Sequence, residues 1–271
     1  MQVLCSTGAF TRTSDPLSHE AIVRYGPTLD ADGLEVIFYP RWYQDIQRVA
    51  RFLRSSALVF PVLHAEKSIG DCFGSSDTSE REMGVQRFEQ NCLFAQLLGV
   101  RTVVLHLWEM PFSDRQLELN LWLLPRCLDL AEQYGLALAI ETIPCTYADP
   151  LTNVKRVVDH DPRAAVALDT EFLAWHHQLD AVFSASWLWR TKLVCHVHLK
   201  DYASHLSAKE VRQYLHPGEG QIDFRRFMQQ LREAGFDGAL SLEARAIDQR
   251  NEVEVARLQR SLHYIRNLLR D

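Results

Sequence analysis

The sequence lacks the marks of a disulfide-stapled, zinc-knuckle or membrane-spanning protein. Its six cysteines are scattered and no Cys-x-x-Cys pair occurs, which is the pattern of reduced thiols. No window reaches the roughly 20 apolar residues that a membrane span requires. The N-terminal stretch MQVLCSTGAF shows no basic region followed by a long apolar run. We therefore expect a soluble cytoplasmic protein with no membrane partner.

An excess of positive charge is missing as well. The chain has 29 basic and 35 acidic residues, which gives a net charge of −6 and an isoelectric point near 6.0. No global basic field is therefore present to attract a polyanion such as DNA. We expect a sugar-like small molecule as the partner and no nucleic acid, and assembly into a homo-oligomer stays open.

Low-complexity segments, linkers and fixed-period repeats are also missing. The content of 47% hydrophobic and 24% charged residues is that of an ordinary globular protein. This composition excludes the disordered, collagen-like and coiled-coil classes. We expect a single domain over residues 1–271.

What the sequence does contain is a series of eight short apolar runs, each followed by a stretch with helical period. The runs are apolar on both faces, as in parallel strands that are covered on both sides. Eight strands alternating with helices in 271 residues predict an α/β fold, a single (β/α)8 TIM barrel, which takes about 250 residues. The runs lie at 3–5, 33–38, 57–64, 101–108, 135–142, 164–170, 193–200 and 238–244.

The clearest predicted helices lie at 77–98, 113–134, 223–233 and 253–269. Gly99 and Gly135 follow the first two of them as stop signals. The first strand-helix unit is irregular because Gly26-Pro27 interrupts any long helix there.

Ionisable side chains stand near the ends of most of these runs. In TIM barrels the active site lies at the carboxyl ends of the strands. Ordinary helix caps would be spread among Ser, Thr, Asn and Asp, which is not the pattern seen here. Taken singly, a strand-end carboxylate more often caps the next helix. It is the joint placement that indicates a site. Along the runs these residues are Glu35, His64, His106, Glu141, Asp169, His196, His198 and Glu243.

Three buried carboxylates at one barrel mouth would repel one another unless a cation lies between them. We therefore predict one divalent metal ion. Oxygen ligands with one imidazole favour Mn²⁺ or Zn²⁺, with Co²⁺ and Mg²⁺ as further candidates. The predicted ligands are Glu141, Asp169, His198 and Glu243.

The same residues carry a resemblance to a known family. Glu141 in LAIET, Asp169 in ALDT, His198 in HVHLKD and Glu243 in LSLEA resemble the strand 5 to 8 metal ligands of the xylose isomerase-like barrels, in particular the sugar phosphate isomerase/epimerase group. HLKD followed by HPGEGQIDF is the most specific part of the match. The resemblance implies an isomerase or epimerase whose metal chelates a carbonyl and an adjacent hydroxyl and stabilises an enediolate. It also implies Glu141 and Glu243 as the catalytic acid/base pair.

The chain departs from this family at one position. Many of its ketose 3-epimerases have a histidine three residues after the strand 6 aspartate, where the present sequence has Phe172. The resemblance therefore implies the metal reaction but not 3-epimerase activity in particular. We expect further substrate contacts from His64, His106, Lys200 and Trp108. Packing or pairing inside the barrel is the alternative role for each.

Two other functions stay open. The apurinic endonucleases of this superfamily bind a second metal at the ends of strands 3 and 4, where His64 and His106 stand, with Glu141 as the bridge. Phe172, the segment RQYLHP and the acidic net charge count against such a phosphodiesterase. The second alternative is a catalytically inactive barrel used for binding.

Overall fold

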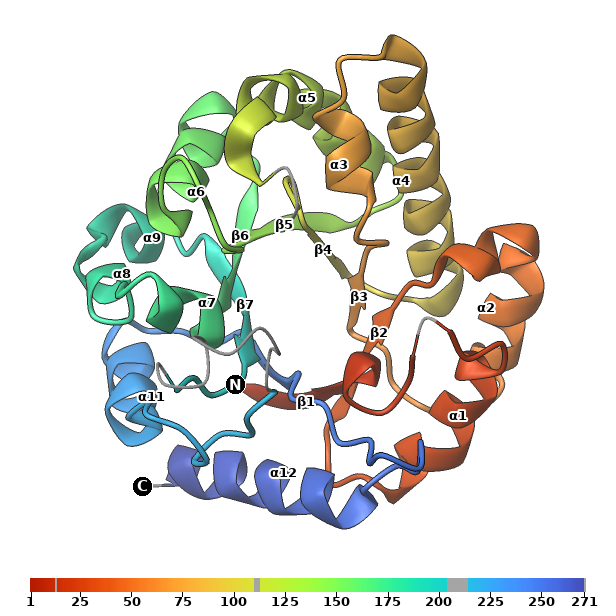
Figure 1. Cartoon of the computed structure of the whole chain (residues 1–271), viewed down its shortest axis with the longest axis vertical. Helices are drawn as coiled ribbons and strands as arrows, with labels where there is room; N and C mark the ends of the chain where they lie inside the picture. Colours follow the sequence, from red (N-terminus) through yellow and green to blue (C-terminus); the bar gives the residue numbers. More distant parts are fainter. Residues whose placement is uncertain (13, 110–112, 204–213, 271) are drawn as a thin grey trace. The chain divides into compact units, whose positions relative to one another are not determined.

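The computed structural model describes residues 1–12, 14–109, 113–203 and 214–270. Its eight strands are parallel neighbours in the order of the sequence and close into a barrel, with helices following them along the chain (Figure 1). This confirms the predicted (β/α)8 fold. The strands are β1 (Gln2–Ser6), β2 (Gly33–Ile37), β3 (Val62–His64), β4 (Thr102–Leu105), β5 (Ala137–Glu141), β6 (Ala165–Asp169), β7 (Val194–Leu199) and β8 (Ala239–Leu242).

The chain divides into two compact units. We call Met1–Glu35 with Leu168–Asp271 the terminal unit and Val36–Ala167 the central unit. The boundaries fall within β2 and β6. The expectation of one domain over residues 1–271 stays a prediction.

In the terminal unit, β1 is paired on both sides. Leu4 lies opposite Gly33 of β2 and opposite Ser241 of β8, and Ser241 in turn lies opposite His198 of β7. This register brings β2, β1, β8 and β7 into one continuous stretch of sheet. The helices of this unit are η1 (Thr7–Ala9), α1 (Ser18–Tyr25), η2 (Gly26–Thr28), α7 (Thr170–Trp175), α8 (Ala181–Ser184), α9 (Ser186–Arg190), α11 (Phe224–Glu233) and α12 (Val255–Arg270).

In the central unit, β4 pairs with β3 and β5, and β5 pairs with the start of β6. Glu141, the last residue of β5, lies opposite Ala167. Asp169 therefore follows two residues later on the neighbouring strand. The helices of this unit are η3 (Pro40–Gln44), α2 (Ile46–Arg54), α3 (Ile69–Phe73), α4 (Thr78–Leu98), η4 (Asp114–Gln116), α5 (Leu117–Gln133) and α6 (Pro150–His160).

The predicted helix boundaries are close to those observed. Asp77 caps α4 by accepting from the backbone N–H of Ser79, and Gly99 ends the helix at a φ of 79°, a conformation that glycine adopts without steric cost. Asp223 caps α11 in the same way. The region predicted as a helix from residue 113 is divided, because a 3₁₀ turn precedes α5.

Except for β1, the strands are shorter than the apolar runs that predicted them. The third run begins at residue 57, yet β3 begins at Val62. Ala57 has a positive φ of 58°, and Pro61 has no N–H to donate to a neighbouring strand. Hydrophobicity alone therefore overestimates the strand. Within the described residues, no helix is both long and apolar enough to cross a membrane.

Candidate functional site

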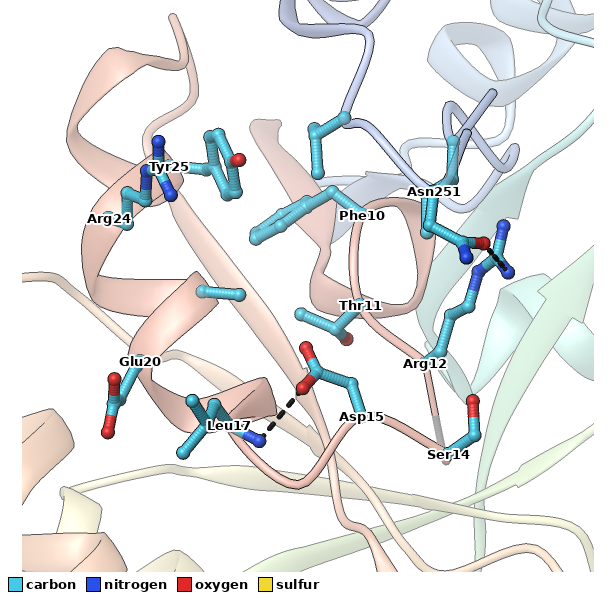
Figure 2. A pocket seen from close by; sticks show the side chains of 13 residues that line it. Phe10, Thr11, Arg12, Ser14, Asp15, Leu17, Glu20, Arg24, Tyr25 and Asn251 are labelled. Carbon is cyan, nitrogen blue, oxygen red and sulfur yellow. Dashed lines mark hydrogen bonds between the residues drawn. The ribbon is translucent and has the colours of Figure 1, made fainter. Parts of the chain in front are cut away.

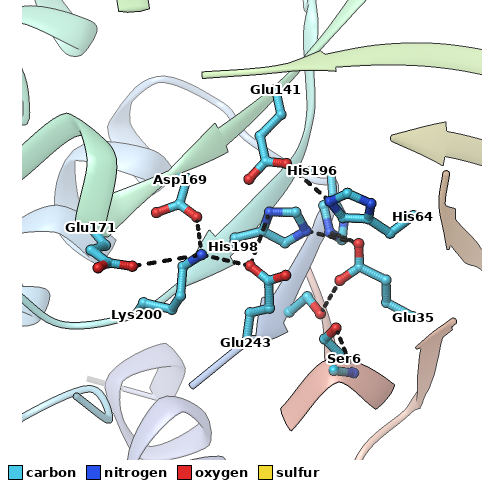
Figure 3. Close-up of polar contacts among 12 residues, drawn as sticks. Ser6, Glu35, His64, Glu141, Asp169, Glu171, His196, His198, Lys200 and Glu243 are labelled. Atoms are coloured by element: carbon cyan, nitrogen blue, oxygen red, sulfur yellow. Dashed lines mark hydrogen bonds and ion pairs between the residues drawn. The ribbon is translucent and has the colours of Figure 1, made fainter. Parts of the chain in front are cut away.

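A lysine lies among carboxylates in the terminal unit (Figure 3). Lys200 Nζ is 2.5 Å from Asp169 Oδ2 and 2.7 Å from Glu243 Oε2, and Glu171 Oε2 is 3.8 Å away. All four side chains are buried. One ammonium thus faces three carboxylates in a region shielded from water, where unbalanced charge is costly. This cluster can accept further positive charge.

The local structure explains the position of Asp169. It ends β6 and begins α7, and its Oδ1 accepts from the backbone N–H of Phe172 at 3.2 Å. One oxygen of Asp169 therefore caps the helix, which is the ordinary role of an aspartate at the end of a strand. The other oxygen faces Lys200. The same carboxylate therefore caps α7 and belongs to the cluster around Lys200.

Phe172 stands where 3-epimerases of the resembling family carry a histidine. Its ring is buried, and Lys200 Nζ lies 4.6 Å from the ring centroid, within the range of a cation–π contact. The side chain therefore contributes to the surroundings of Lys200 through its π face. A contact of this type cannot replace a histidine as a hydrogen-bond partner for a hydroxyl group.

A second group in the terminal unit surrounds Glu35, which lies in the middle of β2 and is fully buried. Its Oε1 is 2.8 Å from His198 Nε2 and 3.4 Å from His196 Nε2 (Figure 3). Its Oε2 accepts from Ser241 Oγ at 2.6 Å. Burial alone would raise the pKa of Glu35. The electrostatic attraction of the His198 and His196 rings and the hydrogen bond with His198 outweigh burial and hold the pKa of Glu35 well below its usual value.

The central unit contains a different cluster, in which two histidines share one carboxylate. His106 Nε2 is 2.6 Å and His64 Nε2 is 3.2 Å from Glu141 Oε2, and His106 Nδ1 contacts Glu109. Burial disfavours charge on both rings. For His106 the carboxylates Glu141 and Glu109 outweigh burial and raise the pKa to about 9, whereas burial keeps the pKa of His64 below its usual value.

The predicted ligands can be compared with these clusters. Asp169, His198 and Glu243 belong to the terminal unit, Glu141 belongs to the central unit, and all four are buried. Carboxylate oxygens with one imidazole are the donors expected for Mn²⁺ or Zn²⁺. The excess of carboxylate over ammonium around Lys200 is consistent with such an ion, so the residues present fit a divalent metal.

The other predicted site residues have different surroundings. Trp108 is buried, and its indole N–H donates to the carbonyl oxygen of Pro144 at 3.3 Å. Lys200 pairs with the carboxylates described above. His64 and His106 pair with Glu141. Contacts of these four residues with a substrate stay a prediction.

Asp201, which directly follows Lys200, has a structural role. Its carboxylate accepts from the backbone N–H groups of Gly218, Gly220 and Ile222 at 2.8–3.0 Å. The carboxylate therefore fixes the glycine-rich turn. A Cβ on Gly220 would lie 2.5 Å from Asp201 Oδ1, which explains why this position is a glycine.

A cavity of about 590 Å³ lies elsewhere in the terminal unit (Figure 2). Several of the polar groups lining it are engaged with one another or with backbone. Arg12 contacts Asn251, and Asp15 accepts from the backbone N–H of Leu17. The residues that line this cavity include none of the predicted ligands or catalytic residues. Its size alone does not make it the site.

Residues 23–268 match a family model described as the xylose isomerase-like TIM barrel. The chain belongs to this family. The match confirms the resemblance to the xylose isomerase-like barrels, while the roles of Glu141, Asp169, His198 and Glu243 stay predictions. A comparison with curated proteins returns no match.

Solved structures similar to this xylose isomerase-like barrel include several sugar epimerases. The 3-keto-D-glucoside 4-epimerase from E. coli is 17% identical, with 98% of this chain and 99% of that chain covered and a TM-score of 0.73. D-allulose 3-epimerase from Methylomonas sp. in complex with D-allulose is 14% identical over 98% and 96%, with a TM-score of 0.75. L-ribulose 3-epimerase is 18% identical over 99% and 94%, with a TM-score of 0.76. At these identities the likeness concerns the fold.

Sequence reasoning identified the strand-end residues of this barrel but gave no role to Glu35. The signal was present, because a glutamate in the middle of an apolar strand must find partners when it is buried. Glu171 was missed altogether. It lies inside the short helix α7, and its position in the sequence resembles that of any residue in a first helical turn.

Proposed function

We propose that the protein is a divalent-metal-dependent isomerase or epimerase acting on a sugar, a sugar phosphate or a hydroxy-keto acid. The observation that carries the proposal is the buried group of Asp169, His198 and Glu243 on β6, β7 and just after β8, where carboxylates exceed the one ammonium. The fold of known sugar epimerases supports the same reaction class.

Glu141, Asp169, His198 and Glu243 would hold the ion. Glu141 ends β5 and Asp169 ends β6, and in TIM barrels the active site lies at the carboxyl ends of the strands. Mn²⁺ and Zn²⁺ are the preferred ions. The ion, when bound, acts as a Lewis acid toward a substrate carbonyl and an adjacent hydroxyl.

The protein's own groups move the proton. Glu141 and Glu243 are proposed as the acid/base pair that removes and returns a proton at the carbon next to the carbonyl. His64 and His106 would hold substrate hydroxyls, and Lys200 with Trp108 would complete the substrate contacts. Because Phe172 replaces the histidine of many 3-epimerases, the hydroxyl contact made by that histidine must be absent or supplied by another side chain.

The experiment is metal analysis of the purified protein followed by a screen of ketoses, their phosphates and hydroxy-keto acids. We expect one tightly bound divalent ion per chain, and isomerisation that is lost on chelation and restored by Mn²⁺. A protein that binds no divalent ion and converts no compound would refute the proposal and favour the binding barrel.

A second candidate, a metal-dependent phosphodiesterase, is favoured by the His64, His106 and Glu141 cluster, which could itself hold an ion. Paired metals suit phosphodiester hydrolysis. The net charge of −6 disfavours tight binding to duplex phosphates. Two or more zinc ions per chain together with cleavage of an abasic oligonucleotide would establish this function in place of the first.

A further inference from the structure

Glu35 is a buried carboxylate whose two oxygens have different partners. Oε2 accepts from Ser241 Oγ at 2.6 Å, and Oε1 is 2.8 Å from His198 Nε2. The three residues lie on β2, β8 and β7 of the terminal unit, and each is fully buried. Placing a carboxylate here costs free energy unless such partners satisfy it.

The contact determines which nitrogen of His198 carries hydrogen. An ionised carboxylate only accepts hydrogen bonds, so Nε2 must be the donor. A histidine that ligates a metal is neutral, so Nδ1 carries the lone pair when His198 serves as a ligand. Nδ1 is also the nitrogen on the side of Glu243, 3.7 Å from Oε2. The ring is thus oriented with its donor toward Glu35 and its acceptor toward the carboxylate cluster.

We propose that Glu35 is a positioning residue that holds His198 in its Nε2–H tautomer and presents Nδ1 as the metal ligand, with Ser241 fixing Glu35 in turn. The inference rests on the proposed metal-dependent function. Carboxylates that accept from the second nitrogen of a metal-ligating histidine fix its tautomer and orientation and raise its basicity.

One competing arrangement uses the same residues. Glu35, His196 and His198 could themselves hold an ion. In that case Glu35 and both imidazoles would all coordinate the ion directly. His196 Nε2 is farther from Glu35 Oε1, at 3.4 Å against 2.8 Å for His198, which favours His198 as the residue that Glu35 serves. The variant His196→Gln separates the two arrangements.

The test compares Glu35→Gln, which keeps the shape of the side chain but removes its charge, with His196→Gln. Affinity for Mn²⁺ and Zn²⁺ is measured by competition with a chromophoric chelator. We expect Glu35→Gln to weaken binding by about 10–100-fold and His196→Gln to leave it nearly unchanged. Unchanged affinity in Glu35→Gln, or an equal loss in both variants, would overturn the proposal.

A second measurement needs no metal. Nitrogen-15 NMR of the metal-free wild-type protein reports which nitrogen of His198 is protonated. We expect the Nε2–H tautomer, with a larger share of Nδ1–H in Glu35→Gln. A wild-type ring with the proton on Nδ1 would refute the positioning role even if metal binds. Conversely, absence of metal binding by the wild type would refute the proposed function, while the tautomer would still report on Glu35.

Ser241→Ala provides a milder variant in case Glu35→Gln does not fold. It removes one hydrogen bond to Glu35 and leaves the carboxylate itself in place. We expect a smaller loss of metal affinity in the same direction, with the same change in tautomer population. A Ser241→Ala protein with wild-type affinity and tautomer would contradict the proposed chain of contacts.

Discussion

In the terminal unit an ammonium lies among carboxylates, whereas in the central unit two imidazoles share one carboxylate. Lys200 faces Asp169, Glu243 and Glu171, and the carboxylates are in excess. His64 and His106 both contact Glu141, and His106 also contacts Glu109, so imidazoles and carboxylates are equal in number here. Similar strand-end residues thus have different charge surroundings in the two units, because their neighbours supply an ammonium in one case and imidazoles in the other.

The largest expected effect is on catalysis, and it tests whether both clusters take part. Glu141→Gln and Glu243→Gln should each lower turnover by about 10²–10⁴-fold or more, because each removes an acid/base group. Turnover of the substrate found in the screen is measured together with circular dichroism. The fold should be unchanged.

Glu66→Gln is the matched control for these two variants. Glu66 is also a buried glutamate close to the end of a strand, but its oxygens accept from the backbone N–H and the hydroxyl of Ser68. Its replacement should affect stability and leave turnover intact. Near-normal turnover in either Glu141→Gln or Glu243→Gln would remove that residue from the proposed pair.

The next effect concerns the charge balance of the terminal unit. Lys200→Met removes the ammonium and leaves Asp169 and Glu243 without it, so the metal-free protein should lose about 3–5 kcal/mol in its free energy of unfolding. Mn²⁺ should then raise the melting temperature of the variant more than that of the wild type. Urea unfolding with and without Mn²⁺ measures both quantities.

Lys192→Met is the corresponding surface control, since Lys192 and Asp237 form an exposed ion pair at 3.7 Å. Such pairs contribute about 0–1 kcal/mol. If Lys200→Met were no more destabilised than Lys192→Met, the terminal cluster would not depend on its ammonium, and the contrast with the central cluster would fail.

Much of the barrel and its strand-end residues could be predicted from the sequence, because both depend on local patterns. Apolar runs mark the strands, and the polar residue after each run marks the mouth of the barrel. Glu141, Asp169 and His198 lie where those patterns predict. The length of β3 could not be predicted from hydrophobicity because a proline and a positive φ shorten it.

Partnerships between distant residues could not be predicted in the same way. Glu35 and His198 are 163 positions apart, and their contact depends on how β2 and β7 are placed by the strands between them. Asp201 and Gly220 are closer in sequence, but the carboxylate could equally have paired with Lys200. Such choices depend on three-dimensional positions that no short sequence pattern encodes.

In each unit a buried carboxylate fixes a loop through backbone N–H groups, and Gly220→Ala tests the terminal one. The new Cβ would lie 2.5 Å from both Asp201 Oδ1 and the carbonyl oxygen of Tyr202. We expect a loss of about 1–3 kcal/mol, as for other overpacked sites. In an Asp201→Ala background the cost should fall, and urea unfolding of the double-mutant cycle measures the coupling. An additive result would show that the carboxylate does not restrict this position.

Asp114 is the corresponding carboxylate of the central unit, and its replacement should have the smallest effect of the series. Its oxygens accept from the backbone N–H groups of Thr146, Tyr147 and Ala148 at 2.8–3.0 Å. Burial would raise its pKa, but these bonds and one from Asn153 outweigh burial and lower it. Asp114→Asn should cost about 1–2 kcal/mol at pH 7, because the charge is lost and the amide NH2 cannot accept from Ala148 and Asn153 as Oδ2 does.

The pH dependence distinguishes this charge effect from a packing effect. A carboxylate whose pKa is lower in the folded than in the unfolded protein stabilises the fold above the unfolded value of about 3.9 and loses that contribution as the pH falls further. The difference in stability between wild type and Asp114→Asn should therefore be constant near neutral pH and shrink below about pH 4. Asp129→Asn, on the exposed surface of α5, serves as the control. A difference that persists unchanged to low pH would show that Asp114 holds its loop by shape and that its charge has no part in it.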